Sequence, residues 1–128
     1  MRYTLKKQEI LRNKKKIKEL FTNGSSFFLY PYKFIYQINT DGEKPVEVLF
    51  TVPVKRFGKA VDRNIIRRRI REAFRLNKQL LIADNQGNFS MILSIIYIGK
   101  SKLSFLEMED KLKEAFIRLH KMGNNKSI

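Results

Sequence analysis

A run of apolar residues from Phe89 to Ile98 is the feature that most constrains how this chain can fold. Aromatic and β-branched residues favour a strand, and here they occupy both of its alternating sides. A strand that is apolar on both sides lies inside a sheet, with other elements covering its two faces. The run is much shorter than the roughly 20 residues that cross a bilayer. It therefore predicts a central, buried strand rather than a membrane helix.

Three segments with apolar residues at helical spacing predict the helices that cover this sheet. They span about 13–23, 62–81 and 104–122. Asn13 is suited to cap the first segment and Asp62 the second, because both side chains accept a backbone N–H. Ser104 and Glu107 form a capping box before the third segment, and Gly123 is expected to end it.

Two further stretches predict strands. Residues 26–40 are rich in aromatic and β-branched residues, and Pro31 is expected to divide them into two strands. Val46–Val54 form the next strand, and turn signals separate these elements at 41–45 and 84–88. The predicted order is helix, two or three strands, helix, strand, helix. That order indicates an α+β sandwich, with one sheet and helices packed against it.

Length and cysteine content bound the domain organisation and the compartment. A chain of 128 residues has the size of one domain. It holds no cysteine, which excludes disulfides and thiolate metal sites and favours a reducing compartment. We therefore expect a cytoplasmic protein with no membrane segment and a single domain over 1–128. Within it, residues 1–12 are expected to form a basic arm and 122–128 a polar tail.

The net charge narrows the class of partner. Lys and Arg number 27 against 12 Asp and Glu, which gives a formal net charge of +15. Such a chain attracts polyanions, so nucleic acid, an anionic membrane and an acidic protein are the partners that fit. A membrane-surface protein needs a wide apolar helix face open to lipid. Each apolar stripe here has a sheet to cover, so nucleic acid is favoured.

The cations are concentrated in residues 55–78, which hold ten Lys and Arg and two acids. On a helix with about 100° per residue, the apolar residues between Ile66 and Phe74 fall on one side and predict the core face. The opposite arc holds Asn64, Arg67, Arg68, Arg71, Arg75 and Lys78. A solvated helix face normally alternates charges at i,i+4, whereas Arg67, Arg71 and Arg75 repel one another at that spacing. Because guanidinium forks match phosphate oxygens, this arc predicts contact with an RNA backbone.

Groups for autonomous catalysis are missing from the sequence. The densest acids, Glu107, Glu109 and Asp110, stand at the start of the third predicted helix, where they complement the helix dipole. His120 is the single histidine and has no acid–base partner of its own kind. No phosphate-loop motif and no metal-ligand spacing occurs. We therefore expect no catalytic residue and no metal site in the protein, so the chemistry must lie in a partner.

The basic segment resembles the signature of the bacterial ribonuclease P protein family. The residues that carry the resemblance are Lys55-Arg56-Phe57-Gly58-Lys59-Ala60-Val61-Asp62-Arg63-Asn64, Arg67-Arg68 and Ile70-Arg71-Glu72-Ala73-Phe74-Arg75. The preceding helix is similar too, with Leu11, Phe21 and Gly24 at family positions. Two residues depart from the pattern: Ile65 stands where the family usually has Lys or Arg, and Ile17 where an aromatic residue is common.

The resemblance implies a two-layer α-β-β-β-α-β-α sandwich, whose four-stranded sheet has a left-handed βαβ crossover, although most crossovers are right-handed. It also implies a monomer in a 1:1 complex with a catalytic RNA subunit, which removes the 5′ leader from precursor tRNA. Mg²⁺ then belongs to the RNA active site, and the protein itself binds no cofactor. The residues implied to bind the RNA subunit are Lys55, Arg56, Lys59, Arg63, Asn64, Arg67, Arg68, Arg71 and Arg75. Those implied to line a cleft for the single-stranded leader are Lys14, Ile17, Phe21, Phe34 and Tyr36.

Two questions stay open at the level of sequence. Phe34 and Tyr36 fall on one face of their predicted strand, and Ile35 and Gln37 on the other, so either face is a candidate for RNA. A ribosomal or other structural RNA-binding protein would share the composition, and only the long signature argues against it. The RNA that co-purifies with the protein would distinguish these two classes.

Overall fold

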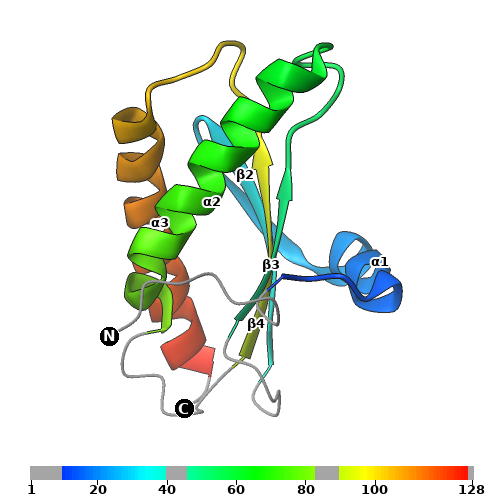
Figure 1. Ribbon diagram of the computed structural model, residues 1–128. Coiled ribbons are helices and arrows are strands. Elements are labelled where there is room, and N and C mark those ends of the chain that lie inside the picture. The colour runs from blue at the N-terminus through cyan, green and yellow to red at the C-terminus, as the bar shows by residue number, and fades with distance from the viewer. Residues whose placement is uncertain (1–9, 40–45, 83–89, 127–128) are drawn as a thin grey trace.

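The computed structural model describes residues 10–39, 46–82 and 90–126, in which a four-stranded sheet lies between helices (Figure 1). The elements are α1 (Lys14–Asn23), β1 (Ser25–Leu29), β2 (Tyr32–Asn39), β3 (Val46–Thr51), α2 (Ala60–Ile82), β4 (Ser90–Tyr97) and α3 (Phe105–Lys126). The predicted α+β class and the α-β-β-β-α-β-α order are confirmed. The turns expected at 41–45 and 84–88, the arm up to residue 9, and Phe89 lie outside the described residues.

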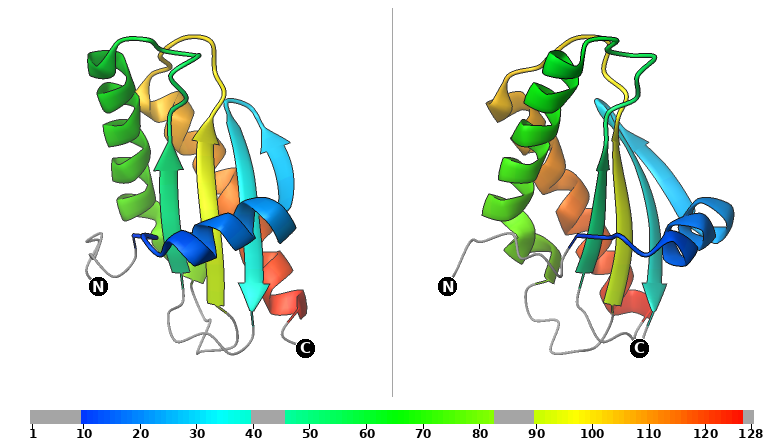
Figure 2. Two further views of the ribbon diagram at one scale, coloured as in Figure 1. Left: turned by 90° about the vertical axis from the view of Figure 1, so that its right-hand side faces the viewer. Right: turned by 45° about the vertical axis from the view of Figure 1, so that its right-hand side comes forward.

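The sheet is mixed, with strand order β1-β2-β4-β3. β2 runs antiparallel to both β1 and β4, whereas β3 and β4 are adjacent and parallel. Leu93 in β4 pairs with Tyr36 of β2 on one side and Val48 of β3 on the other. In the left view of Figure 2, β4 lies to the right of β3 while α2 passes behind the sheet, so this crossover is left-handed.

Both faces of β4 are covered, as its composition predicts. One face, with Met91, Leu93, Ile95 and Tyr97, belongs to the main core, which packs under α2 and α3. The other face carries Ile92 and Ile96 into a second, smaller cluster beneath α1. The buried residues of that second cluster are Leu11, Leu20 and Ile35. The sheet therefore separates two unequal apolar layers, and α1 alone among the helices lies on the smaller side (Figure 2).

Helix boundaries follow the predicted caps in part. Asn13 caps α1, because its side-chain oxygen accepts the N–H groups of Lys15 and Lys16 at 3.0 and 3.2 Å. The prediction that Asp62 caps α2 is wrong. The helix begins earlier, because Arg63 N–H already donates to the Lys59 carbonyl at 3.2 Å. Asp62 instead lies in the first turn of α2.

The expected end of α3 at Gly123 is also wrong, because the helix continues to Lys126. A glycine inside a helix costs only about 1 kcal/mol relative to alanine. It ends a helix only where the backbone turns left-handed. The last part of the predicted N-terminal arm, at residues 10 and 11, is attached to the sheet. Ile10 forms a parallel bridge with Val48, and buried Leu11 donates to the Val48 carbonyl at 2.8 Å.

The close approach at Gly24 generates a test of how α1 is joined to the sheet. A Cβ atom at Gly24 would lie 2.4 Å from the Leu20 carbonyl oxygen and 3.1 Å from Cγ2 of Ile35. Because backbone must move to relieve this contact, we expect Gly24→Ala to lower the free energy of unfolding by about 1–2 kcal/mol. Urea denaturation followed by circular dichroism measures it. Gly58→Ala is the matched control, since nothing lies within 4 Å of its Cβ position, and equal losses in the two variants would contradict the steric explanation.

Candidate nucleic-acid interface

Helix α2 presents a buried face and a basic face, as the spacing of its residues predicts. Ile66, Ile70, Ala73 and Phe74 are fully buried in the main core. The outward side carries a row of residues that we call the α2 ridge, made of Asn64, Arg67, Arg68, Arg71 and Arg75. Lys78, predicted on the same arc, is buried instead, with 4% of its surface exposed. The ridge therefore ends one turn earlier than the helical projection indicates.

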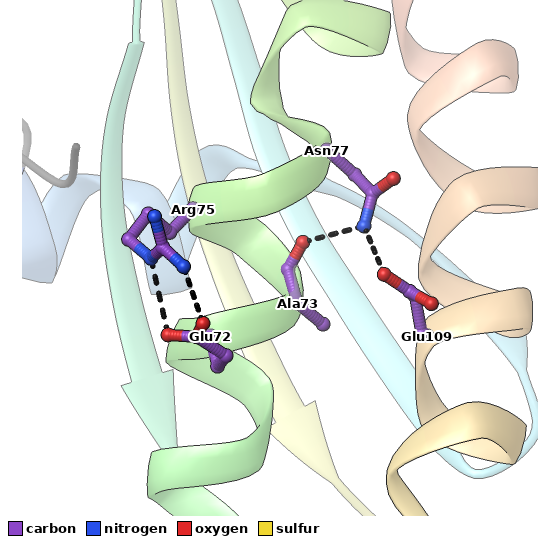
Figure 3. A network of polar contacts seen from close by, with 5 residues as sticks. All are labelled: Glu72, Ala73, Arg75, Asn77 and Glu109. Carbon is purple, nitrogen blue, oxygen red and sulfur yellow. Dashed lines mark hydrogen bonds and ion pairs between the residues drawn. The ribbon is translucent and has the colours of Figure 1, made fainter. Parts of the chain in front are cut away.

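The cations of the α2 ridge differ in how they are partnered. Arg67 donates to the Asn64 side-chain oxygen at 2.9 Å. Arg75 forms a two-pronged ion pair with Glu72, and this hydrogen bond holds the pKa of the Glu72 carboxyl below its usual value (Figure 3). Among the residues that the structure describes, Arg68 and Arg71 have no such partner. These two guanidinium groups can bind a phosphate without breaking an internal ion pair.

Together these side chains surround a shallow depression on the surface of α2. Its volume is about 440 Å³, and it is lined by Asn64, Arg67, Arg68, Arg71, Glu72 and Arg75. Five of these six residues form the ridge, and Glu72 is the one acid among them. The long side chains, rather than a fold in the backbone, create this hollow. Its chemistry is that of an open anion site along a helix.

The inner side of α2 is held against α3 by a polar contact. Asn77 donates from one amide nitrogen to the Ala73 carbonyl and to the Glu109 carboxylate, both at 2.9 Å (Figure 3). Glu107 accepts a hydrogen bond from Ser104 at the predicted capping box, at 3.0 Å. Two of the three clustered acids at the start of α3 thus have structural partners. Of these contacts, the one between Asn77 and Glu109 joins α2 to α3.

The basic loop, residues 55–59, leads from β3 into α2. Lys55, Arg56 and Lys59 are exposed there. Arg63, predicted as an RNA contact, turns back from α2 and donates to the Phe57 and Gly58 carbonyls at 2.8 and 2.9 Å. The structure therefore places Arg63 as a support of the loop. This role had no signal in the sequence, where Arg63 looks like its basic neighbours.

A second support of the basic loop was missed entirely at the level of sequence. The Phe57 ring stacks on Tyr97, with ring centroids 5.9 Å apart. Tyr97 ends β4, far along the chain from the basic segment. The pairing arises only once β3 and β4 lie side by side in the sheet. No local pattern could have indicated it.

The residues predicted to line the leader cleft do not form one surface, so that grouping is wrong. Lys14, Ile17 and Phe21 lie on α1, and 49% of the Phe21 surface is exposed. Phe34 is fully buried in the main core, and both it and Tyr36 contact Phe27 there, at 5.0 and 6.0 Å between ring centroids. The two groups are thus on opposite faces of the sheet, because alternate residues of a strand point to opposite sides.

The face of β2 that carries Ile35 lies beside α1. Ile35 packs beneath α1 in the second cluster, and Gly24 at the end of α1 approaches its side chain. Lys33 is two residues before Ile35 and so points to the same side. Its ammonium lies 5.3 Å from the centroid of the Phe28 ring, of which 63% is exposed. Exposed rings and cations therefore stand together on the α1 side.

The described residues contain neither a metal-binding cluster nor a membrane-spanning helix. No group of three or more His, Asp or Glu side chains within residues 10–39, 46–82 and 90–126 is arranged to hold a metal ion. Over the same ranges, every helix is too short or too polar to cross a membrane. The depression on the α2 ridge is the strongest candidate site that the geometry presents.

Comparisons with known proteins agree with this geometry. The family model described as Ribonuclease P matches residues 5–120. The ribonuclease P protein component of Porphyromonas gingivalis is 38% identical over 120 residues, which cover 91% of this chain and 87% of that protein. The corresponding protein of Syntrophus aciditrophicus is 32% identical over 122 residues, covering 95% of this chain and 93% of that protein.

Solved structures show the same fold. The ribonuclease P protein from Thermotoga maritima superimposes with a TM-score of 0.70 and 24% identity, covering 86% of this chain and 96% of that chain. The Staphylococcus aureus protein gives a TM-score of 0.69 at 19% identity, covering 88% and 95%. With the family model matched over most of its length and relatives above 30% identity spanning nearly all of it, this chain belongs to the bacterial ribonuclease P protein family, as the protein component of the holoenzyme.

Proposed function

We propose that the protein binds the RNA subunit of ribonuclease P through the α2 ridge and the basic loop, and that the 1:1 complex removes the 5′ leader from precursor tRNA. The observation that carries the binding mode is the pair Arg68 and Arg71. Both are exposed, and neither forms an ion pair with an acidic side chain among the described residues. A charge-assisted contact from such a group to phosphate is stronger than a neutral hydrogen bond.

The charge distribution supports a role in binding rather than in catalysis. The net charge of +15 favours association of the protein with a polyanion such as RNA. Phosphodiester hydrolysis with metal ions needs ligands that hold those ions, and we propose that the RNA supplies them for Mg²⁺. The protein then contributes affinity and position. Neutralised phosphates also lower the concentration of Mg²⁺ that the folded RNA requires.

The leader surface that we propose lies on the α1 side of the sheet. Phe21 and Phe28 offer exposed rings, and bases stack on such rings whatever their identity. Lys14 and Lys33 add cations on the same side. We leave Phe34 and Tyr36 out of this surface because they face the main core. The protein then contacts the RNA subunit and the leader on different sides of its sheet.

The division of labour between protein and RNA leads to a prediction about catalysis. The purified protein should cleave no precursor tRNA. The protein with its RNA subunit should cleave it at a lower Mg²⁺ concentration than the RNA alone, because bound cations replace part of the ionic screening. Cleavage assays over a Mg²⁺ titration measure this. Removal of the leader by RNA-free protein would refute the assignment of chemistry to the RNA.

The α2 ridge generates a second prediction. Arg68→Ala and Arg71→Ala should each weaken assembly with the RNA subunit by about 1–3 kcal/mol, the range for a hydrogen bond to a charged group. The dependence of affinity on salt should become shallower, because fewer counterions are released. Filter binding at several salt concentrations measures both quantities.

Arg118→Ala is the matched control for that experiment. It removes the same charge from α3, where the guanidinium lies 4.9 Å from the centroid of the Phe27 ring instead of on the ridge. We expect its affinity for the RNA subunit to stay within about 0.5 kcal/mol of the parent. If Arg118→Ala weakens assembly as much as the ridge variants do, binding depends on total charge and not on the ridge.

The exposed ring of Phe21 generates a third prediction. Phe21→Ala should weaken binding of leader-bearing precursor tRNA to the assembled complex by about 1–3 kcal/mol, the value of one base–aromatic stack. Binding of mature tRNA, which lacks the leader, should stay unchanged. Leu106→Ala is the control, since it removes an apolar side chain of similar exposure, 64%, from α3. Equal losses for both RNAs would show that Phe21 acts through packing.

A further inference from the structure

We propose that Tyr97 is a positioning residue for RNA binding, because it holds the basic loop and the loop after β4 in one fixed arrangement. This inference rests on the proposed role of the basic loop in binding the RNA subunit. A buried residue of the sheet, which does not itself contact RNA, would then keep the loop cations in position for binding.

The aromatic ring of Tyr97 packs against the basic loop from the sheet. Tyr97 is fully buried at the end of β4. Its ring stacks on Phe57 with an interplanar angle of 27° and packs against Tyr32 at 6.0 Å on the core side. Phe57 stands between the exposed Arg56 and Gly58. The stack therefore anchors the middle of the basic loop to the sheet.

The hydroxyl group of Tyr97 orders a second loop. It donates to the Ser101 carbonyl at 2.6 Å and accepts the Leu103 N–H at 3.3 Å. A phenol is protonated at neutral pH, and burial raises the pKa of Tyr97 further, so the hydroxyl can both donate and accept a hydrogen bond. One side chain thus ties residues 98–104 to the same point that supports the basic loop. Both loops lie at the same end of the sheet in each view of Figure 2.

Both loops are also joined to the first turns of α2, where the ridge begins. Lys102 forms an ion pair with Asp62 at 2.9 Å, and Arg69 donates to the Leu103 carbonyl. Arg63 holds the Phe57 and Gly58 carbonyls. The basic loop, the loop after β4 and the start of α2 therefore form one network, in which Tyr97 is the member that contacts both loops.

The backbone beside Tyr97 is shaped for its ring. A Cβ atom at Gly99 would lie 2.8 Å from Cζ and from the hydroxyl oxygen of Tyr97. The ring cannot swing aside freely, because the stack on Phe57 and the two hydrogen bonds hold its outer end. Glycine at position 99 thus leaves the space that this arrangement needs. Gly99→Ala offers a way to disturb Tyr97 without altering it.

A fixed loop matters because ordering costs free energy at the moment of binding. Immobilising a flexible side chain at an interface costs conformational entropy and so lowers affinity. With the loop held before RNA arrives, the exposed cations Lys55, Arg56 and Lys59 are already in place. Without the stack, that cost falls on the binding step, so affinity drops although every cation is still present.

The test compares Tyr97→Leu with Tyr97→Phe in assembly with an in vitro transcript of the RNA subunit. Tyr97→Leu removes the stack, and we expect affinity to fall roughly tenfold, the equivalent of one or two ordered side chains. Because the three loop cations are still present and reach phosphates once the loop is ordered, the salt slope should stay that of the parent. Tyr97→Phe keeps the ring and loses only the contacts to Ser101 and Leu103, so its affinity should fall less than that of Tyr97→Leu.

Hydrogen exchange supplies a readout that general loss of stability would not reproduce. The amides of Arg56 and Phe57 donate to the Pro53 carbonyl at 3.1 and 3.4 Å. In Tyr97→Leu and Gly99→Ala these amides should exchange faster than in the parent, while amides of the β1–β2 pair stay protected. Phe57→Leu removes the same stack as Tyr97→Leu, so the two losses should not add, and the double variant should be no weaker than Tyr97→Leu alone.

Two outcomes would overturn the proposal. One is a folded Tyr97→Leu protein with the affinity of the parent; if that variant does not fold, the same result for Phe57→Leu decides. The other is strict additivity of the two substitutions. Arg68→Ala and Arg71→Ala, measured alongside, separate this proposal from the function on which it rests. If they weaken assembly while Tyr97→Leu and Phe57→Leu do not, only the positioning role is wrong; if all four are neutral, the RNA site itself is wrong.

Discussion

Burial of β4 on both faces is the constraint on which the rest of the structure depends. A central strand with Met91, Leu93 and Ile95 on one side and Ile92 and Ile96 on the other needs cover above and below. Helices α2 and α3 meet most of this need, and α1 meets the remainder on the smaller face. Because the apolar faces of the helices turn toward the sheet, the cations of α1 and α2 are directed outward on opposite sides. The two surfaces that we propose for RNA binding are therefore consequences of how the core is covered.

Helix α2 both covers the core and presents the basic ridge. Its buried face supplies Ile66, Ile70 and Phe74 to the core, and its ridge presents guanidinium groups to solvent. Repulsion along the ridge opposes helix formation by a few tenths of a kcal/mol per i,i+4 pair. Burial of a single large apolar side chain contributes about 1.5–3 kcal/mol, so packing outweighs the repulsion. The core thereby holds charges at a spacing that an isolated helix would disfavour.

Local patterns predicted the elements of this fold well, and long-range contacts set the limits of prediction. The continuous apolar run Phe89–Ile98 and the apolar stripe from Ile66 to Phe74 are local patterns along the chain, so strand and helix were correctly expected. The burial of Phe34 depends on which face of β2 meets α1, and no spacing records that choice. The support roles of Arg63 and Tyr97 depend on carbonyls and rings brought together by folding. The signature indicated the segment that we propose for RNA binding, but not the residues that hold this segment in place.

The strand order has a consequence for how the chain is made. β4 lies between β2 and β3 in the sheet, yet the ribosome synthesises it after both. Until β4 emerges, β2 and β3 each keep an unpaired edge, and the hairpin of β1 and β2 lacks the antiparallel neighbour of β2. Closing the β3–β4 pair spans the whole of α2, and such non-local pairing is slow. The sheet can therefore be completed only after β4 has been made, when the arginine-rich helix α2 has already been synthesised.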